Sequence, residues 1–239
     1  MNQMSKQVGM SRNITLGYLN KVIELMNTED DPSLIKESLQ EHISFYIQDK
    51  TNINKTVSIL TNIWLLDTDD NKSIKTYARK IVTKSSETTK LVANWCMMLI
   101  SYSVFKDIAS TVGKLDDMQL ELTSKVIKEK MLDSWGERTT LIHAIPKNIK
   151  TMKDINVLET VKNGMYKSKK YEVKDSEAVI LIVATLIHLK KKLYLSIDEL
   201  INDEAMFPFK YNIDLEMLQE SKLFSFDRFG GEMVISLKG

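Results

Sequence analysis

Through residues 12 to 112 the apolar side chains recur at the spacing that gathers them on one face of an α-helix. The stretch ITLGYLNKVIELM is typical, because it places near one face Ile14, Leu16, Leu19, Val22, Ile23 and Met26. Only three prolines and eight glycines interrupt the 239 residues of the chain. The pattern predicts a mainly α fold that opens with a bundle of about five or six helices and has no strand between residues 12 and 112.

Residues 157 to 173 depart from the helical pattern with the sequence VLETVKNGMYKSKKYEV. Two stretches rich in Val, Leu, Met and Tyr flank Asn163 and Gly164. Asn-Gly favours the two-residue hairpin turn of type I′, because both central residues of that turn need a positive φ angle. We therefore expect a β-hairpin with a basic edge here. A second hairpin, without the basic edge, is predicted over residues 223 to 237 with its turn at Gly230 and Gly231.

The order of these elements predicts three units along the chain. Residues 1–115 form the helical bundle. Residues 116–174 contain a helix, a short break at Gly136, a second helical stretch and the basic hairpin, which is the order of a winged helix-turn-helix. Residues 175–239 repeat helices followed by a hairpin. This C-terminal helical unit is either a second winged unit or a structural or oligomerising cap.

The sequence also indicates where the two helices of the predicted winged unit begin. The first is expected to begin near Asp116 or Asp117. The second contains Pro146, and a proline inside a helix costs roughly 3 kcal/mol because it removes a backbone hydrogen bond. Either this helix begins near His143 to Ile145, so that Pro146 falls in its first turn, or it is kinked at Pro146. We favour the late start, with a short turn before it.

Charge is distributed unevenly along the chain. The whole protein has a formal charge of +1, which indicates nothing about its partners. Residues 138 to 174, however, hold nine basic and three acidic residues, a local charge of +6. Lysines recur every third residue along the second helix of the winged unit, and hydroxyl groups at its start can contact phosphate. The predicted DNA contacts are Arg138, Thr139, Thr140, Lys147, Lys150, Lys153, Lys162, Lys167, Lys169 and Lys170.

Motifs for enzymatic chemistry are missing from the sequence. The three histidines are far apart, and there is no glycine-rich phosphate loop, nucleophile elbow or zinc-protease motif. Cys96, the one cysteine, lies in the apolar run VANWCMMLI, which predicts a buried thiol and excludes a disulfide framework. We predict no catalytic residue, no metal and no cofactor.

The apolar runs of the chain are short. The longest, Leu91 to Phe105 and Ala178 to Leu189, fall below the ~20 residues that a membrane-spanning helix needs. The start of the chain is polar and has no signal-peptide core. These features predict a soluble, cytoplasmic protein that has no membrane partner.

Several stretches resemble the BrxA family of the bacterial BREX phage-defence systems. They are GYLNKVIELM, PSLIKESLQEHI, ISYSVFKDIASTV and, most clearly, TTLIHAIPKNIKTMKDINVLE, and the resemblance covers about residues 12 to 160. It implies a helical bundle like that of the antitermination factor NusB, with a winged-helix portion that binds DNA in a cytoplasmic defence complex. Pro146 and the scarcity of arginine depart from the family's pattern, which bears on the contacts assigned to Lys147 and Lys150.

The resulting functional expectation is a non-enzymatic accessory protein of phage defence that binds double-stranded DNA, mainly through the phosphate backbone. Two alternatives stay open at this point. The chain could be a scaffold that binds other subunits of a defence complex without touching nucleic acid. It could also bind RNA, as the likeness of the bundle to NusB suggests.

Overall fold

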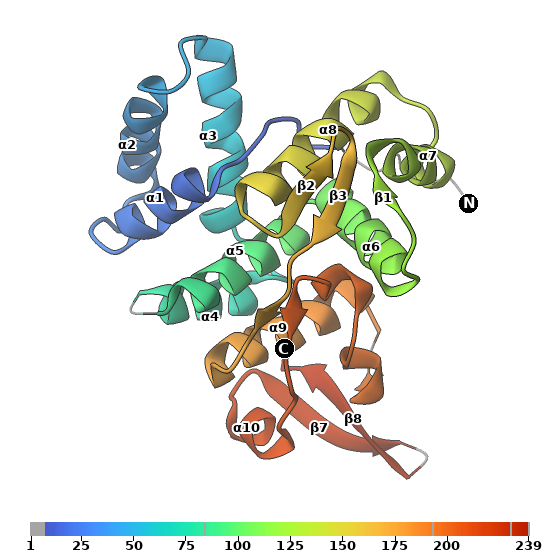
Figure 1. The fold of residues 1–239 in the computed structure, drawn as a ribbon. Coiled ribbons are helices and arrows are strands. Elements are labelled where there is room, and N and C mark those ends of the chain that lie inside the picture. The colour runs from blue at the N-terminus through green and yellow to red at the C-terminus, as the bar shows by residue number, and fades with distance from the viewer. Residues whose placement is uncertain (1–7, 84, 193, 230, 239) are drawn as a thin grey trace.

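The computed structural model describes residues 8–83, 85–192, 194–229 and 231–238. Six helices come first (Figure 1): α1 Leu16–Met26, α2 Pro32–Ser44, α3 Lys50–Trp64, α4 Lys72–Val82, α5 Glu87–Ser101 and α6 Ser103–Asp117. Among the described residues between 12 and 112 there is no strand, as the helical periodicity predicts. The predicted fold class, mainly α with short β-hairpins, is confirmed.

Side chains at the helix starts fix where the bundle helices begin. The Thr15 hydroxyl accepts a hydrogen bond from the backbone N–H of Tyr18, and Asp49 does the same for Asn52. Asp31 caps α2, and Pro32 occupies its first position. Each such cap satisfies a backbone N–H that the helix itself leaves unpaired, and contributes about 1 kcal/mol.

The second unit has the strand pairing of a winged helix. After α6 come β1 (Leu122–Thr123), α7 (Ser124–Trp135), α8 (Thr139–Asp154), β2 (Leu158–Lys162) and β3 (Met165–Ser168). β1 and β2 both pair antiparallel with β3, so the sheet order is β1-β3-β2. The predicted helix start near Asp116 or Asp117 is wrong, because α6 ends there and β1 intervenes before α7.

Pro146 lies in the middle of α8, so the predicted start near His143 to Ile145 is also wrong. Leu141 and Ala144 in the first turns are fully buried, and this packing offsets the backbone hydrogen bond that the proline removes. Pro146 itself is exposed. The carbonyl of Ile142, which loses its helical partner, therefore lies toward the solvent side of the helix.

The basic hairpin forms as predicted, but its turn is not of type I′. Gly164 has a φ of 73°, whereas Asn163 is not among the described non-glycine residues with positive φ. The pairing register shifts between Thr160 and Lys162, so an irregularity in β2 accompanies the turn. With this bulge in β2, the hairpin closes with one residue of positive φ, Gly164. A type I′ turn would need two such residues.

We expect Gly164→Val to destabilise the protein by about 1 kcal/mol or more, because a β-branched side chain is strained at positive φ. Space does not limit the substitution, since the nearest atom to an added Cβ is the Ser124 hydroxyl oxygen at 4.0 Å. Chemical denaturation monitored by circular dichroism measures the loss. An unchanged midpoint would contradict the left-handed conformation of Gly164.

The C-terminal unit repeats the same strand pairing. It consists of α9 (Ser176–Lys190), β5 (Leu195–Ser196), two short 3-10 helices η1 (Asp198–Leu200) and η2 (Glu204–Met206), α10 (Leu215–Glu220), β7 (Phe224–Phe229) and β8 (Glu232–Leu237). Its sheet has the order β5-β8-β7, so again the first strand pairs with the last. The hairpin predicted over residues 223 to 237 is confirmed, although Gly230 lies outside the described residues.

One pairing joins the second and third units. β4 (Tyr171–Glu172) leaves the basic hairpin and pairs in parallel with β6 (Phe209–Lys210). The hairpin therefore ends at Ser168 and not at residue 173, as the sequence suggested. Figure 1 shows this connection below the hairpin, where the chain passes toward α9.

The buried apolar residues form one continuous core that reaches from Val8 to Ile235. Near its centre the Trp95 indole N–H donates to the Ala205 carbonyl at 2.9 Å, which docks η2 on the bundle. Cys96 is fully buried, and burial raises the pKa of its thiol to about 12. The predicted buried thiol is confirmed. Of the helices in the described part of the chain, none has the length and apolar character needed to cross a membrane.

Candidate nucleic-acid interface

Helix α8 has one buried and one exposed face. Leu141, Ile145 and Ile149 are among its buried residues, and they anchor the helix in the core. The exposed face is formed by Thr139, Thr140, His143, Pro146, Lys147 and Lys150. This spacing of three to four residues makes a continuous ridge along the helix. We call this face the α8 ridge.

An extended N-terminal segment holds α8 from the side. The Asn148 side-chain N–H donates to the Met10 carbonyl at 2.9 Å, and the Thr151 hydroxyl accepts from the Ile14 backbone N–H at 2.9 Å. Asn13 also donates to the carboxylate of Asp154 at 2.8 Å. These bonds, made by largely buried groups, fix the rotation of α8 about its axis and so fix the direction of the α8 ridge.

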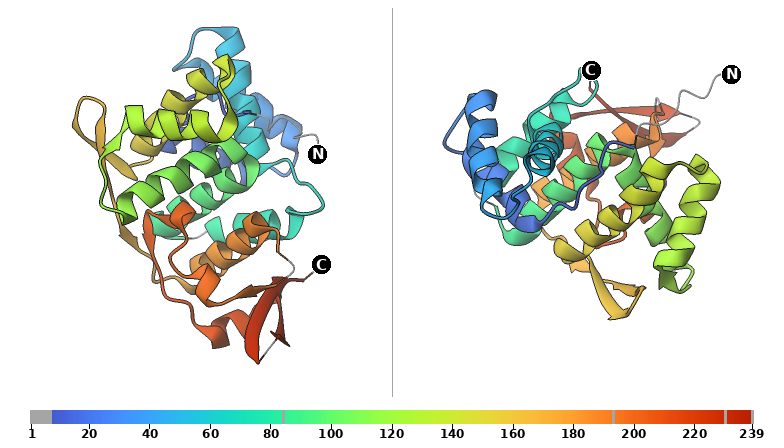
Figure 2. Two further views of the ribbon diagram at one scale, coloured as in Figure 1. Left: turned by 90° about the vertical axis from the view of Figure 1, so that its right-hand side faces the viewer. Right: turned by 90° about the horizontal axis from the view of Figure 1, so that it is seen from above.

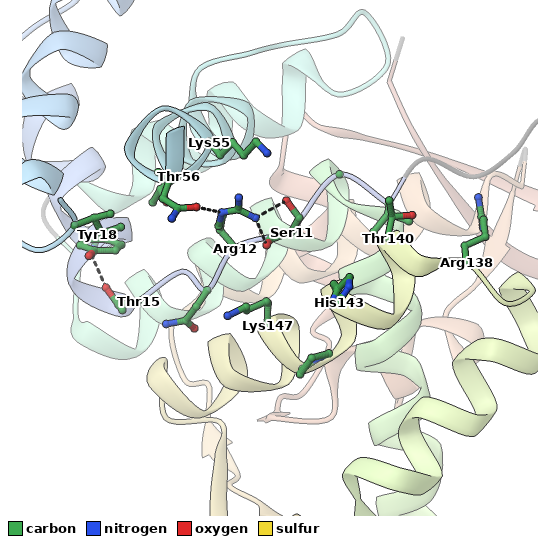
Figure 3. Close-up of a pocket in the computed structure, with 16 residues that line it drawn as sticks. Ser11, Arg12, Thr15, Tyr18, Lys55, Thr56, Arg138, Thr140, His143 and Lys147 are labelled. Carbon is green, nitrogen blue, oxygen red and sulfur yellow. Dashed lines mark hydrogen bonds between the residues drawn. The ribbon is translucent and has the colours of Figure 1, made fainter. Parts of the chain in front are cut away.

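A hollow of about 1240 Å³ lies on one side of the α8 ridge, between α8, α3 and the N-terminal segment (Figure 3). We call it the large hollow. Its basic residues are Arg12, Lys55, Arg138 and Lys147, and no carboxylate is found among the described residues that line it. Cations gathered on one concave surface produce a positive potential that attracts anionic ligands, and no ion pair of Arg12, Lys55 or Lys147 is found among the described residues.

Arg12 lies in the centre of the large hollow, as Figure 3 shows. Its Nε–H donates to the Asn52 side-chain oxygen at 2.9 Å, and one terminal nitrogen donates to the Ser11 carbonyl at 2.9 Å. Both partners are neutral, so the guanidinium is positioned without losing its charge to a carboxylate. Several donors of the guanidinium remain for an anion, because arginine carries five.

Two residues of the large hollow escaped the sequence analysis. Arg12 and Lys55 lie far from residues 138 to 174, in stretches where basic residues are scattered and not clustered. Only the tertiary packing of α3 and the N-terminal segment beside α8 brings them to Lys147. For Arg12 the local sequence offers only the polar stretch SRN, which is like that of many loops, and for Lys55 it offers no signal.

A second, smaller hollow of about 290 Å³ lies on the other side of the α8 ridge, against α7 and β3. Its polar lining includes Lys128, Lys150, Lys153 and Tyr166, again without a carboxylate among the described lining residues. The Lys153 ammonium lies over the ring of Tyr166, 5.8 Å from its centroid. Lys128, like Arg12 and Lys55 of the large hollow, could be recognised only from the structure.

The three helix lysines predicted from the sequence therefore do not share one side of α8. Lys147 faces the large hollow, whereas Lys150 and Lys153 face the small hollow. Lys150 also pairs with Asp154 at 2.8 Å, and its side chain is 56% exposed. An exposed i,i+4 pair of this kind contributes less than about 0.5 kcal/mol, so it is easily exchanged for another anion.

Two of the hairpin lysines lie on the projecting wing. Lys162 at the end of β2 and Lys167 in β3 are exposed. Both views in Figure 2 show the hairpin extending beyond the helices that carry it. Because β2 contacts α8, these two exposed side chains lie on a hairpin that adjoins the helix carrying the α8 ridge.

The other two predicted lysines, Lys169 and Lys170, lie beyond the end of the hairpin. The Lys169 ammonium donates to the Asn156 side-chain oxygen at 2.6 Å. The Lys170 ammonium contacts Asp116 at 2.5 Å and the Phe207 carbonyl at 2.8 Å. The bonds of Lys170 connect α6, the chain after the hairpin and the C-terminal unit, whereas the bond of Lys169 connects the end of the hairpin to the turn before β2. Both lysines are therefore engaged within the fold.

The start of α8 holds the remaining predicted residues. Thr139 and Thr140 occupy the first two helical positions and are exposed. The Arg138 guanidinium donates to the Trp135 carbonyl at 3.2 Å and lies 5.5 Å from the centroid of the Trp135 ring. Thr139 and Thr140 thus lie at the beginning of the helix, as the sequence indicates, and Arg138 and Thr140 line the large hollow.

The resulting geometry is an exposed helical ridge with a basic hollow on each side, and the described residues that line the two hollows include no carboxylate. Comparisons of the chain with protein-family models, curated proteins and solved structures found no match. The functional argument therefore rests on this geometry and on the chemistry of its side chains.

Proposed function

We propose that the protein binds double-stranded DNA by placing the α8 ridge in the major groove. The major groove is about 12 Å wide and accepts one α-helix. The phosphate backbones that border the groove then lie on both sides of the helix. The observation that carries the proposal is the pair of basic hollows, one on each side of α8, in which the described lining residues include no carboxylate.

In this proposal the two hollows bind the two phosphate backbones of the duplex, one each. Arg12, Lys55 and Lys147 would hold one phosphate strand in the large hollow. Lys128 and Lys153 would hold the opposite strand from the small hollow, with the wing following it through Lys162 and Lys167. Lysine binds phosphate as a point charge and reads no base, so binding with low sequence specificity follows.

The cellular role belongs to the same proposal. The resemblance to BrxA supports an accessory role in a cytoplasmic phage-defence complex, with other subunits of that complex as protein partners. The proposal includes no catalytic step, metal or cofactor. A scaffold that never touches nucleic acid is the alternative, but it leaves the two hollows without an explanation.

The proposal is tested by titrating the protein into a fluorescently labelled blunt duplex and measuring anisotropy. We expect micromolar or tighter binding at low salt, with single-stranded RNA of equal length competing poorly, because the α8 ridge fits the groove of a B-form duplex. Absence of duplex binding at low salt would favour the scaffold. Equal or better competition by the RNA would favour an RNA-binding protein.

A further inference from the structure

Aromatic side chains gather at one end of the large hollow. Figure 3 places Tyr18 at the opposite end of this hollow from Arg138. The Tyr18 ring meets the ring of Tyr46 at a centroid distance of 5.9 Å, and His42 lies 5.3 Å from Tyr46. Phe45 is the neighbour of Tyr46 in the turn between α2 and α3. We call Tyr18, His42, Phe45 and Tyr46 the aromatic cluster.

The cluster is open to solvent in a way that packing alone does not explain. Phe45 is 78% exposed and Tyr46 is 66% exposed, the two highest fractions among the exposed large apolar residues of the described chain apart from Met118 at 69%. Leaving such rings in water forgoes the stabilisation that burial would bring. Their faces are available to a flat ligand that stacks on them.

The cluster continues the basic path of the large hollow. Tyr18 and Ile47 line the hollow together with Arg12 and Lys55. The exposed charged residues near the rings in sequence are Glu41, Asp49 and Lys50, so the excess of positive charge in the hollow does not continue over the cluster. A phosphate chain is thus attracted up to Tyr18, and past that point the ring faces favour bases over phosphates.

We infer that the large hollow and the aromatic cluster together bind an unpaired DNA strand that continues from the duplex. A positively charged groove that leads to exposed aromatic rings is the combination by which proteins hold single-stranded nucleic acid, with the backbone on cations and the bases stacked on rings. The inference rests on the proposed function and narrows its substrate to duplex DNA with a single-stranded extension.

The experiment compares a blunt duplex with the same duplex carrying a short oligo(dT) tail on the 3′ or on the 5′ strand. One tail polarity is expected to bind roughly tenfold more tightly than the blunt duplex, because stacking of one or two bases contributes about this much. In the double variant Phe45→Ala/Tyr46→Ala the tail should bring no gain. Binding of the blunt duplex should stay within about twofold of the wild type, since both rings lie outside the two basic hollows.

Two control variants separate stacking from other effects. Tyr46→Phe keeps the ring and should retain the gain. Leu66→Ala/Met118→Ala removes two other exposed apolar side chains, 59% and 69% exposed, and should also retain it. Because Phe45 and Tyr46 are largely exposed, their removal leaves the core intact, and a thermal melt checks this.

The outcomes are distinguishable. If the blunt duplex fails to bind, the proposed function itself is wrong. If the blunt duplex binds but neither tail adds affinity, or if the gain survives Phe45→Ala/Tyr46→Ala, only the present inference is overturned. Self-association of the wild type that this double variant abolishes, without any gain from a tail, would assign the aromatic cluster to a contact between copies of the chain.

Discussion

Gly113→Ala is expected to destabilise the protein by roughly 2–3 kcal/mol, despite replacing a glycine inside a helix. Gly113 lies in α6 where η2 crosses it, and an added Cβ would approach the Glu204 carbonyl oxygen to 2.0 Å and its carbon to 2.7 Å. These are backbone atoms, so η2 must move away as a unit. The gain of about 1 kcal/mol in helix propensity does not offset this displacement.

Differential scanning calorimetry should show a melting temperature lowered by about 5–10 °C for a protein of this size. Gly17→Ala is the matched control, because Gly17 also lies in a helix, is exposed, and the nearest atom to its added Cβ is the Thr15 hydroxyl oxygen at 3.8 Å. It should be neutral or slightly stabilising. Equal melting temperatures for the two variants would contradict the docking of η2 on α6.

The second large effect concerns binding. Reversing the charge of Lys55, Lys128 and Lys147 together should weaken duplex binding roughly 100-fold or more at about 0.1 M salt. The three lysines come from α3, α7 and α8, are exposed, and form no ion pair among the residues that the structure describes. The loss should be similar for unrelated DNA sequences, because phosphate contacts carry no base information.

The control for this variant must reverse the charge of three lysines that lie outside the two hollows. Lys190 and Lys192 are unsuitable because they pair with Asp203 and Glu199, so reversing them would disturb the C-terminal unit. Lys72, Lys80 and Lys222 suit this purpose, because they are exposed, form no ion pair among the described residues and line neither hollow. Their reversal gives the same net charge and should weaken binding only a few-fold. A loss equal to that of the first variant would mean that net charge and not the α8 ridge governs binding.

The local sequence contained enough information to predict most elements of the fold. Apolar residues recur in every turn of a helix, so one residue that departs from the pattern does not hide it. The helices of the bundle were therefore predicted correctly. Gly164 likewise marks its hairpin, because few other residues adopt its φ of 73°. The start of α8 was predicted wrongly, since the burial of Leu141 and Ala144 that outweighs Pro146 is a property of the packed protein.

Short strands and distant contacts could not be predicted in this way. β1 and β4 have two residues each, too few for an alternating pattern, and they exist because a partner strand lies beside them. The candidate site was predicted only in part, because contacts between distant segments of the chain assemble it. Lys147 was recognised from its place in a basic segment, but Arg12 joins it only through the bonds that hold the N-terminal segment against α8.

The slope of the logarithm of the duplex binding constant against the logarithm of salt concentration tests the central claim most directly. Each phosphate contact contributes about −0.9 to this slope for B-form DNA. The account predicts a slope of about −4 or steeper for the wild type, and a slope shallower by roughly 2 to 3 for the variant reversed at Lys55, Lys128 and Lys147. Identical slopes for the two proteins would contradict it, because the three lysines that flank the α8 ridge would then release no counterions from DNA.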